Sequence, residues 1–185
     1  MRILTTQEAR DWCWARGLKM TDGRYLRYEP WNASCVTISL EDKPSRVIAL
    51  ADHLVPTWED VPFRGALLWV RERGIWGDFS EKAAELMVRQ MRLGSGETQT
   101  LDMKPAQLFE PDELFSMHSY FLIPMLFGWD AFLIPLDEDY YFFVSHDGFL
   151  VIVGRADGAL EQIRQRVREW NPQKDEGWYH GVARG

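Results

Sequence analysis

The alternation of apolar and polar residues changes along the chain, and each pattern predicts a different element. Residues 24–30 follow an Asp-Gly pair and form a strand-like run. Apolar side chains at every second position of residues 36–40 predict a strand with one buried face. We expect the run 46–50 to return from a Pro-containing loop as the second strand of a hairpin. Residues 65–70 predict a further strand, although a buried helix could carry the same run.

Four other segments carry the spacing and end signals of helices. They are expected at about 6–16, 78–92, 111–124 and 158–170. Thr5 and Glu8 fit a capping box before the first helix, and Asp78 and Glu81 fit a second box. Pro124 limits how far the third helix continues, because a proline interrupts the helical hydrogen bonds.

Beyond residue 128 the pattern changes to that of a sheet, with three short β-rich runs. They span 129–135, 139–145 and 149–155. Asp147-Gly148 between the last two runs predicts a two-residue hairpin loop, which would pair Phe143 with Ile152. Both faces of this hairpin are apolar. We therefore expect it inside a sheet covered on both sides, or covered by protein on one side and by a partner on the other.

Hairpins rather than strand–helix–strand crossovers connect most of the predicted strands, which indicates the α+β class. The prediction is a largely antiparallel sheet with a C-terminal three-strand meander, flanked by about four helices. We expect one domain over residues 1–171, with 172–185 as a mobile tail. The tetrapeptide Phe-Leu-Ile-Pro occurs at 121–124 and 132–135. We interpret the first copy as a helix end and the second as a strand, so the repeat is a coincidence.

Composition is that of a globular protein with an unusual content of rings. Of the 185 residues 46% are hydrophobic, 26% charged and 14% aromatic, so bulky rings must fill the core or coat a binding surface. The two cysteines form no Cys-x-x-Cys pair, which favours a reduced, cytoplasmic chain and leaves one disulfide as the alternative. No signal peptide and no run long enough to span a bilayer is seen, so we expect a soluble protein without a membrane partner.

The net charge of −7 is unevenly distributed along the chain. Residues 93–154 contain ten acids and one base, Lys104, which gives −9, whereas the rest contains 18 acids and 20 bases. This distribution disfavours nucleic acid as a partner for the acidic segment and suits a basic protein. A solvated acidic face that only maintains solubility is the alternative.

None of the common catalytic or metal-binding motifs is present. The four histidines lack zinc-ligand spacing, and an EF-hand loop starting at Asp137 fails at its fifth position, Tyr141. Ser145, His146 and Asp147 are adjacent, so alternating strand geometry argues against a catalytic relay. No phosphate-binding glycine motif occurs either. We therefore expect no catalytic residue, no metal and no cofactor.

The candidate binding residues are acids, aromatics and a histidine at the two ends of the meander. They are Trp129, Asp130, Asp137, Glu138, Asp139, Tyr140, Tyr141, His146 and Asp147. The acids 137–139 and the turn 146–148 are expected at opposite ends of one hairpin, about 20–25 Å apart at ~3.3 Å per residue. A shared active site is therefore not expected, and the prediction is an acidic rim around an aromatic sheet.

The leading hypothesis is a non-catalytic soluble binding protein, of inhibitor or immunity type, that docks a basic protein through this acidic, aromatic-rich half. Two alternatives remain. One is a small-molecule binder or hydrolase with an aromatic pocket formed by Trp129, Tyr140 and Tyr141, with His146 and Asp139 as polar groups. The other is a structural homodimer formed through the apolar meander.

Overall fold

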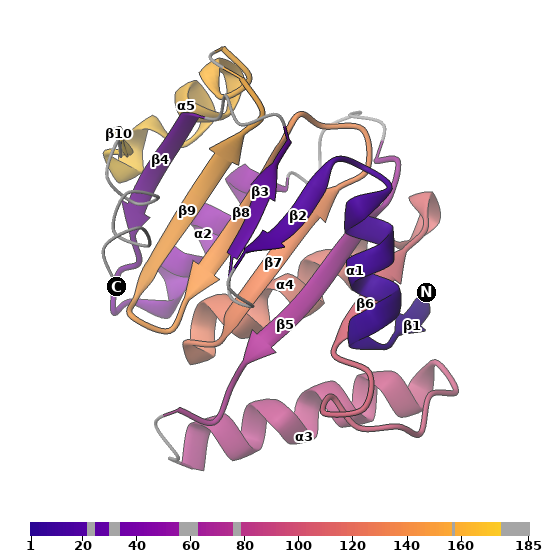
Figure 1. The fold of residues 1–185 in the computed structure, drawn as a ribbon. Coiled ribbons are helices and arrows are strands. Elements are labelled where there is room, and N and C mark those ends of the chain that lie inside the picture. Colours follow the sequence, from indigo (N-terminus) through magenta and orange to yellow (C-terminus); the bar gives the residue numbers. More distant parts are fainter. Residues whose placement is uncertain (22–24, 30–33, 56–62, 76–78, 157, 175–185) are drawn as a thin grey trace.

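A computed structural model describes residues 1–21, 25–29, 34–55, 63–75, 79–156 and 158–174. In these residues the chain forms five α-helices and an eight-stranded sheet (Figure 1). The strand order is β1-β6-β5-β7-β8-β9-β4-β10, and each pair of neighbours is antiparallel. The predicted α+β class, the antiparallel sheet and the meander β7–β9 are confirmed.

The sheet strands are short, and the central ones are nearly continuous apolar runs. Their bounds are β1 Arg2–Leu4, β4 Ser34–Ser39, β5 Ala66–Glu72, β6 Ala106–Phe109, β7 Asp130–Pro135, β8 Tyr140–Ser145, β9 Phe149–Gly154 and β10 Gln173–Lys174. Side chains of β5 and β7–β9 are buried on both faces, as expected of strands inside a covered sheet.

Helices cover one side of the sheet, which we call the helix face. They are α2 (Pro44–Leu54), α3 (Phe79–Gly94), α4 (Leu114–Phe127) and α5 (Glu161–Arg166), with 3₁₀ turns η1 (Pro111–Glu113) and η2 (Arg168–Trp170). α4 packs against α2, α3 and the central strands. Leu68, Leu133, Phe142 and Ile152 point into this core and are at most 1% exposed.

The opposite side, called the hairpin face, is covered by α1 (Thr6–Trp14) and by a separate two-stranded hairpin, β2 (Leu18–Thr21) and β3 (Tyr25–Tyr28). Both lie in front of the sheet in Figure 1. Trp69, Phe132, Tyr141 and Val153 are fully buried beneath them. The meander is thus covered on both sides by this chain itself, the first of the two arrangements that its pattern predicted.

Local signals at the first helix are confirmed in detail. Thr5 Oγ1 accepts a hydrogen bond from the Glu8 backbone, and the Glu8 carboxylate accepts one from the Thr5 backbone, which is the predicted capping box. The helix ends at Trp14, slightly before the expected position. Asp78 lies outside the described residues, so the second capping box stays a prediction.

The predicted register of the β8–β9 hairpin is wrong by one residue. Phe143 pairs with Val151, not with Ile152, because the connection is the three-residue loop 146–148 rather than Asp147-Gly148 alone. Gly148 has φ +79, the left-handed conformation that closes a three-residue loop. The shift moves every β9 side chain to the face opposite the predicted one.

The expected strand at 46–50 is also wrong, because these residues lie within α2. Pro44 occupies the first turn, where its missing N–H removes no helical hydrogen bond. Val47, Leu50 and Leu54 recur at helical spacing and are buried against the helix face. The four consecutive apolar residues Val47 to Leu50 favour a strand locally, and the helical period is visible only over the longer segment.

Pro124 does not end the third helix, contrary to expectation. It lies inside α4, which continues to Phe127 and ends at Gly128 in the left-handed conformation. Six other residues of α4 are buried, and this packing outweighs the roughly 3 kcal/mol that an internal proline costs. The second Phe-Leu-Ile-Pro copy does lie in a strand, β7.

Strands β1, β6 and β10 were not predicted. They are two to four residues long, too short for a hydrophobic period to show. β10 begins the segment expected to be a mobile tail, and it pairs with β4. Residues 175–185 lie outside the described part of the chain.

Candidate binding site

Three consecutive acids, Asp137 to Asp139, lie in the connection between β7 and β8, which we call the acidic loop (residues 136–139). Two backbone hydrogen bonds fix its ends. Leu136 N donates to Gly65 O at 2.9 Å, and Arg155 N donates to Asp139 O at 2.7 Å. The loop is therefore held by the residues next to β5 and β9, the strands on either side of the β7–β8 pair.

Gly65 allows the close approach of this loop to β5. Its φ is +111, and a Cβ at this position would lie 2.5 Å from Leu136 Cδ1 and 2.6 Å from Phe109 O. No side chain other than hydrogen fits there without moving the backbone of β6 or the loop. The sequence between Phe63 and Ala66 thus positions the acids.

Arginines from three distant segments lie opposite the acidic loop. Arg64 Nε is 3.4 Å from Asp137 Oδ2, and Arg155 Nε is 3.4 Å from Asp139 Oδ1. All four side chains are at least half exposed, so these pairs add little to stability. Arg166 of α5 is the third, and its charge acts on Glu138.

Glu138 differs from its two acidic neighbours. No Lys or Arg nitrogen of the described residues lies within 4 Å of its carboxylate. Loss of surrounding water raises the pKa of Glu138, Arg166 opposes this effect, and the charges of Asp137 and Asp139 add to it. Within the described part of the chain, Glu138 is therefore the acid of the loop that lacks an ion-pair partner.

A small apolar pocket lies on the helix-face side of the acidic loop. Its apolar lining includes Leu54, Leu114, Met117 and Leu133. Tyr140 and four charged residues also line it, namely Arg64, Asp137, Glu138 and Arg166. Its volume is about 80 Å³. Burial and the nearby Glu138 charge raise the pKa of Tyr140 to about 12, so its hydroxyl stays protonated and can donate a hydrogen bond.

A broader, polar hollow of about 420 Å³ lies on the other side of the same loop. Arg155 crosses it, donating from Nη2 to Arg16 O at 2.9 Å and stacking on the Tyr28 ring at 4.9 Å. Asp137 and Asp139 line it as well. The acidic loop therefore forms a wall between an apolar pocket and a polar hollow.

Two of the predicted binding residues lie in the cores instead of on the surface. Trp129 is fully buried in the helix-face core. Tyr141 is fully buried on the hairpin face, and its hydroxyl donates to Leu26 O at 2.5 Å. Neither side chain is accessible to a partner in this conformation.

Three further predicted residues, Asp130, His146 and Asp147, gather at the other end of the meander. Asp130 Oδ1 accepts hydrogen bonds from the backbone N and from Nδ1 of His146, each at 2.8 Å. His146 Nε2 lies 3.6 Å from Asp147 Oδ1. Burial alone would lower the pKa of His146, but the hydrogen bond and charge of Asp130, with smaller contributions from Asp147 and Glu72, raise it.

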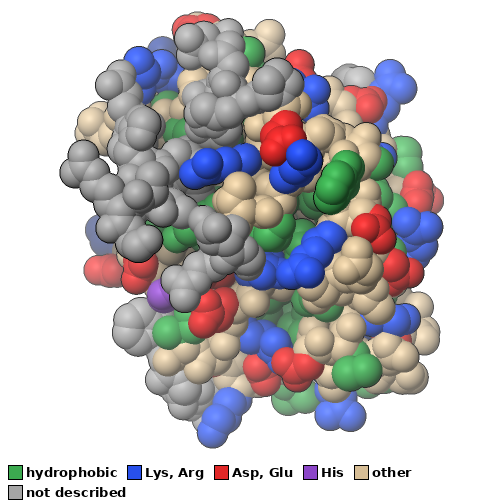
Figure 2. All heavy atoms as spheres, viewed as in Figure 1, with side chains coloured by type: hydrophobic (Ala, Val, Ile, Leu, Met, Phe, Trp, Pro, Cys, Tyr) green, Lys and Arg blue, Asp and Glu red, His purple; other side chains and the backbone are tan. Residues whose placement is uncertain are grey.

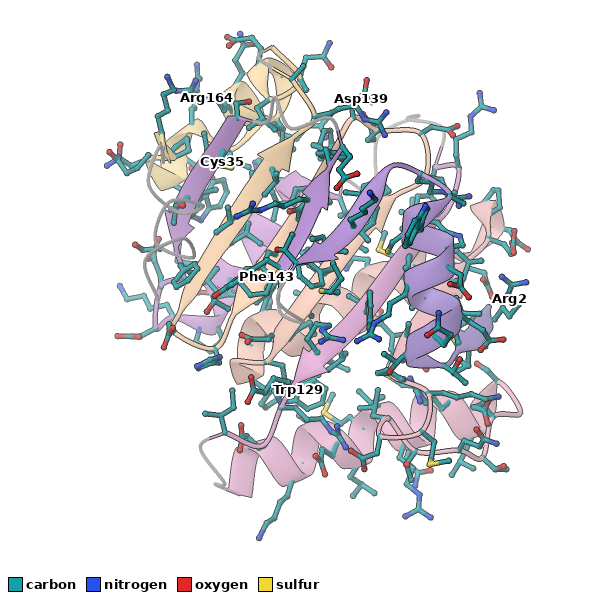
Figure 3. The ribbon with its side chains drawn as sticks, in the orientation of Figure 1. Arg2, Cys35, Trp129, Asp139, Phe143 and Arg164 are labelled. Carbon is teal, nitrogen blue, oxygen red and sulfur yellow. The ribbon has the colours of Figure 1, made fainter. Side chains whose placement is uncertain are left out.

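The candidate residues therefore do not converge on one site. β8 separates the acidic loop from the His146 turn, a span of roughly 20 Å for six residues at ~3.3 Å each. Figure 3 labels Asp139 and Trp129 toward opposite ends of the sheet. The arrangement offers a surface for contacts, and no shared centre for acid–base chemistry across the nine residues.

Residues that complete the site were missed from the sequence. No local motif links Arg64 and Arg166 to the acids, whereas Arg155 directly follows β9, the hairpin partner of β8. Leu136 lies where the sequence predicts a polar turn, although it lines both hollows.

Among the described residues, no group of three or more His, Cys, Asp or Glu side chains is arranged to hold a metal ion. Within the same ranges, none of the helices has the length and apolar character needed to cross a bilayer. No protein-family model, curated protein or solved structure matches the chain.

Proposed function

We propose that this protein is a non-catalytic binding protein that docks a basic protein through the acidic loop and the apolar pocket beside it. The observation that carries the proposal is Glu138, a carboxylate with no ion-pair partner among the described residues, at the mouth of an apolar pocket. A partner that inserts an apolar side chain would bring a neighbouring Lys or Arg to this carboxylate.

Other acids lie close to the same pocket. Leu114, which lines it, directly follows η1, whose segment contributes exposed Glu110 and Asp112. The N-terminal amine pairs with Glu113 of the same turn. Phe115 is 70% exposed next to Leu114, an apolar ring at the margin of an acidic surface. Such a surface has the charge to steer a basic partner and the apolar contacts to hold it.

The size of the pocket favours a protein partner over a small-molecule ligand at this position. Ligand pockets are usually about 300–1,000 Å³, whereas this one is about 80 Å³. That volume accommodates part of one side chain. The hydrolase alternative also finds no support, since Trp129, Tyr140, Tyr141 and His146 do not share a pocket.

The homodimer alternative remains a prediction without a specific observation in its favour. It required an exposed apolar meander, and β7, β8 and β9 are covered on both faces by this chain.

The proposal is tested by retaining partners from a native extract on immobilised protein at about 0.15 M salt and eluting at about 1 M, where charge interactions are screened within ~3 Å. We expect a basic protein in the eluate. With that partner purified, titration calorimetry should show that Glu138→Gln makes binding about 1.5–3 kcal/mol less favourable, the range for a lost hydrogen bond to a charged group.

Asp42→Asn is the matched control. Asp42 is an exposed acid in the connection after β4, at the end of the sheet where Leu40 bonds to the His146 turn, away from the acidic loop. Its substitution should leave the affinity unchanged. If both variants lost the same affinity, the effect would come from the net charge of the protein and not from Glu138. Binding that does not depend on salt would contradict the proposal.

A further inference from the structure

A third hollow, which we call the cationic pocket, lies on the hairpin face between α1 and the β2–β3 hairpin. Its volume is about 260 Å³. Arg10 and Trp14 of α1 and Lys19 of β2 line it, and Trp69 of the central strand β5 contributes to its floor. The remaining lining residues are apolar or, in the case of Cys13, a thiol.

Among the described residues, the charged side chains of this lining are positive only, and no Asp or Glu belongs to it. Burial raises the pKa of Cys13 to about 12, so its thiol stays neutral. Arg10 has no ion-pair partner within 4 Å among the described residues, and Lys19 pairs with Glu29, which is outside the lining.

A further cation strengthens the field beside the pocket. The Arg71 guanidinium lies 4.7 Å from the centroid of the Trp69 ring. Burial lowers the pKa of Arg71, and the positive charge of Arg10 lowers it further, while Asp130 and Glu72 act against both. Figure 2, viewed from this side, shows Lys and Arg side chains across the centre of the face.

The other polar hollows lack this one-signed lining. The hollow between α3 and residues 97–102 contains Arg73, but Arg73 already pairs with Glu85 and Asp102, which line the same space. The hollow beside the acidic loop is lined by the three acids as well as by Arg16 and Arg155. In both places an anion would meet carboxylates beside the arginines.

Two indoles point to a ring as the second part of a ligand. Trp14 is 67% exposed at the pocket margin, with Lys19 Nζ 5.2 Å from its ring centroid. An exposed indole beside a cation can stack on a planar ring while the cation binds an attached anionic group. Trp69 is fully buried in the floor, and its Nε1 donor has no acceptor in the described part of the chain.

From this cationic lining and its exposed indole we infer that the pocket binds a small ligand in which a planar ring carries an anionic group, either a nucleoside phosphate or an aromatic carboxylate. Arg10 and Lys19 bind the anion, and Trp14 stacks on the ring. At about 260 Å³ the space is close to the lower end of ligand pockets, ~300 Å³, which limits the ligand to one or two rings.

The experiment separates the ring from the anion by titrating the full chain with four probes. Adenosine monophosphate and benzoate contain both parts, adenosine has the ring alone, and inorganic phosphate has the anion alone. We expect one of the first two to bind at least about tenfold more tightly than adenosine and phosphate, because both contacts form together. Tighter binding of adenosine monophosphate identifies the nucleoside phosphate, and tighter binding of benzoate the aromatic carboxylate.

Variants test the assigned residues. Trp14→Ala should weaken binding of the preferred probe by about fivefold or more, the low end for a lost stacking contact. Arg10→Gln should weaken it at least about threefold, and more at low salt. Both side chains are exposed, so folding should be unchanged, which circular dichroism checks. Arg164→Gln, an exposed arginine on α5 across the sheet, is the matched control.

Three outcomes would overturn the inference: phosphate binding as well as the ring-bearing anions, adenosine binding as well as its phosphate, or losses in Arg164→Gln equal to those in Arg10→Gln. The site is also independent of the acidic loop. Trp14→Ala should not alter retention of a basic protein, and Glu138→Gln should not alter probe binding, so one proposal can fail without the other.

Discussion

The two faces of the sheet differ in charge and in the kind of contact that they offer. The helix face ends in the acidic loop and an apolar pocket of side-chain size, whereas the hairpin face carries the larger cationic pocket. Tyr140 and Tyr141 illustrate how sharply they are separated. These neighbours in β8 belong to different faces, one lining the apolar pocket and the other holding the β2–β3 hairpin. Because successive side chains of a strand point to opposite faces, one step along β8 moves a residue from one surface to the other.

The largest expected change in stability comes from truncating one buried ring in each core, which tests whether the two cores are equally well packed. Phe142→Ala on the helix face and Phe132→Ala on the hairpin face should each lower the free energy of unfolding by about 3–5 kcal/mol. Both rings are fully buried among other aromatics, so each truncation leaves a cavity. Chemical denaturation measures both. A loss of less than about 1 kcal/mol for Phe132→Ala alone would mean that the hairpin face is not a firmly packed core.

A smaller effect is expected where the two neighbouring tyrosines are compared. Tyr141→Phe removes the buried hydrogen bond to Leu26 O and should lower the free energy of unfolding by about 1–2 kcal/mol. Tyr140→Phe should change the free energy of unfolding by less than about 0.5 kcal/mol. The reason is that the Tyr140 hydroxyl makes no hydrogen bond to a described residue. Equal losses for the two variants would contradict the assignment of Tyr141 as the link between sheet and hairpin.

The smallest effect concerns pH at the far end of the meander. The pKa of His146 is raised in the folded protein, so the stabilisation by its charged form is complete below the unfolded pKa of ~6.5. It is lost as the pH rises through the folded value. His146→Gln should therefore cost more stability at about pH 5.5 than at about pH 8.5. The difference should be about 0.5 kcal/mol, as for a partly exposed ion pair.

Asp130→Asn supplies the control for that measurement, since it removes the carboxylate that accepts from Nδ1. In the Asp130→Asn background, His146→Gln should lose most of its pH dependence. A cost that instead grows with pH would mean that the neutral ring is the stabilising form.

The fold class and the meander were predictable because their signals are local. Separate apolar runs in the sequence predict strands β7 to β9, and the Thr5–Glu8 capping box lies within four residues. The failures have a common cause, which is that tertiary packing outweighs a local preference. Pro124 inside α4 is tolerated by a buried helix, and residues 46–50 join a helix whose period is visible only over Pro44–Leu54.

The candidate site was predictable only in part. The clustering of acids at 137–139 and their separation from His146 followed from the hairpin signal, and the structure has them at opposite ends of β8. Arg64 and Arg166 could not be assigned to those acids, because Arg64 reaches them through the β5–β7 pairing and Arg166 through the packing of α5, which no single segment encodes. Arg155 follows β9, so its place beside Asp139 was predictable from the hairpin. Trp14 was missed for a simpler reason, namely that it lies just beyond the buried stripe of α1.

The position of β4 in the sheet has a consequence for how the chain is made. In the described residues, β4 (34–39) hydrogen-bonds only to strands from the last third of the sequence, β9 and β10. During synthesis, more than a hundred residues after Val36 and Ile38 must therefore be added before either partner strand exists. Such long-range pairing makes folding slow, and the waiting strand is exposed to aggregation. A ribosome-bound chain that ends before β9 is thus the state in which this protein most needs a chaperone.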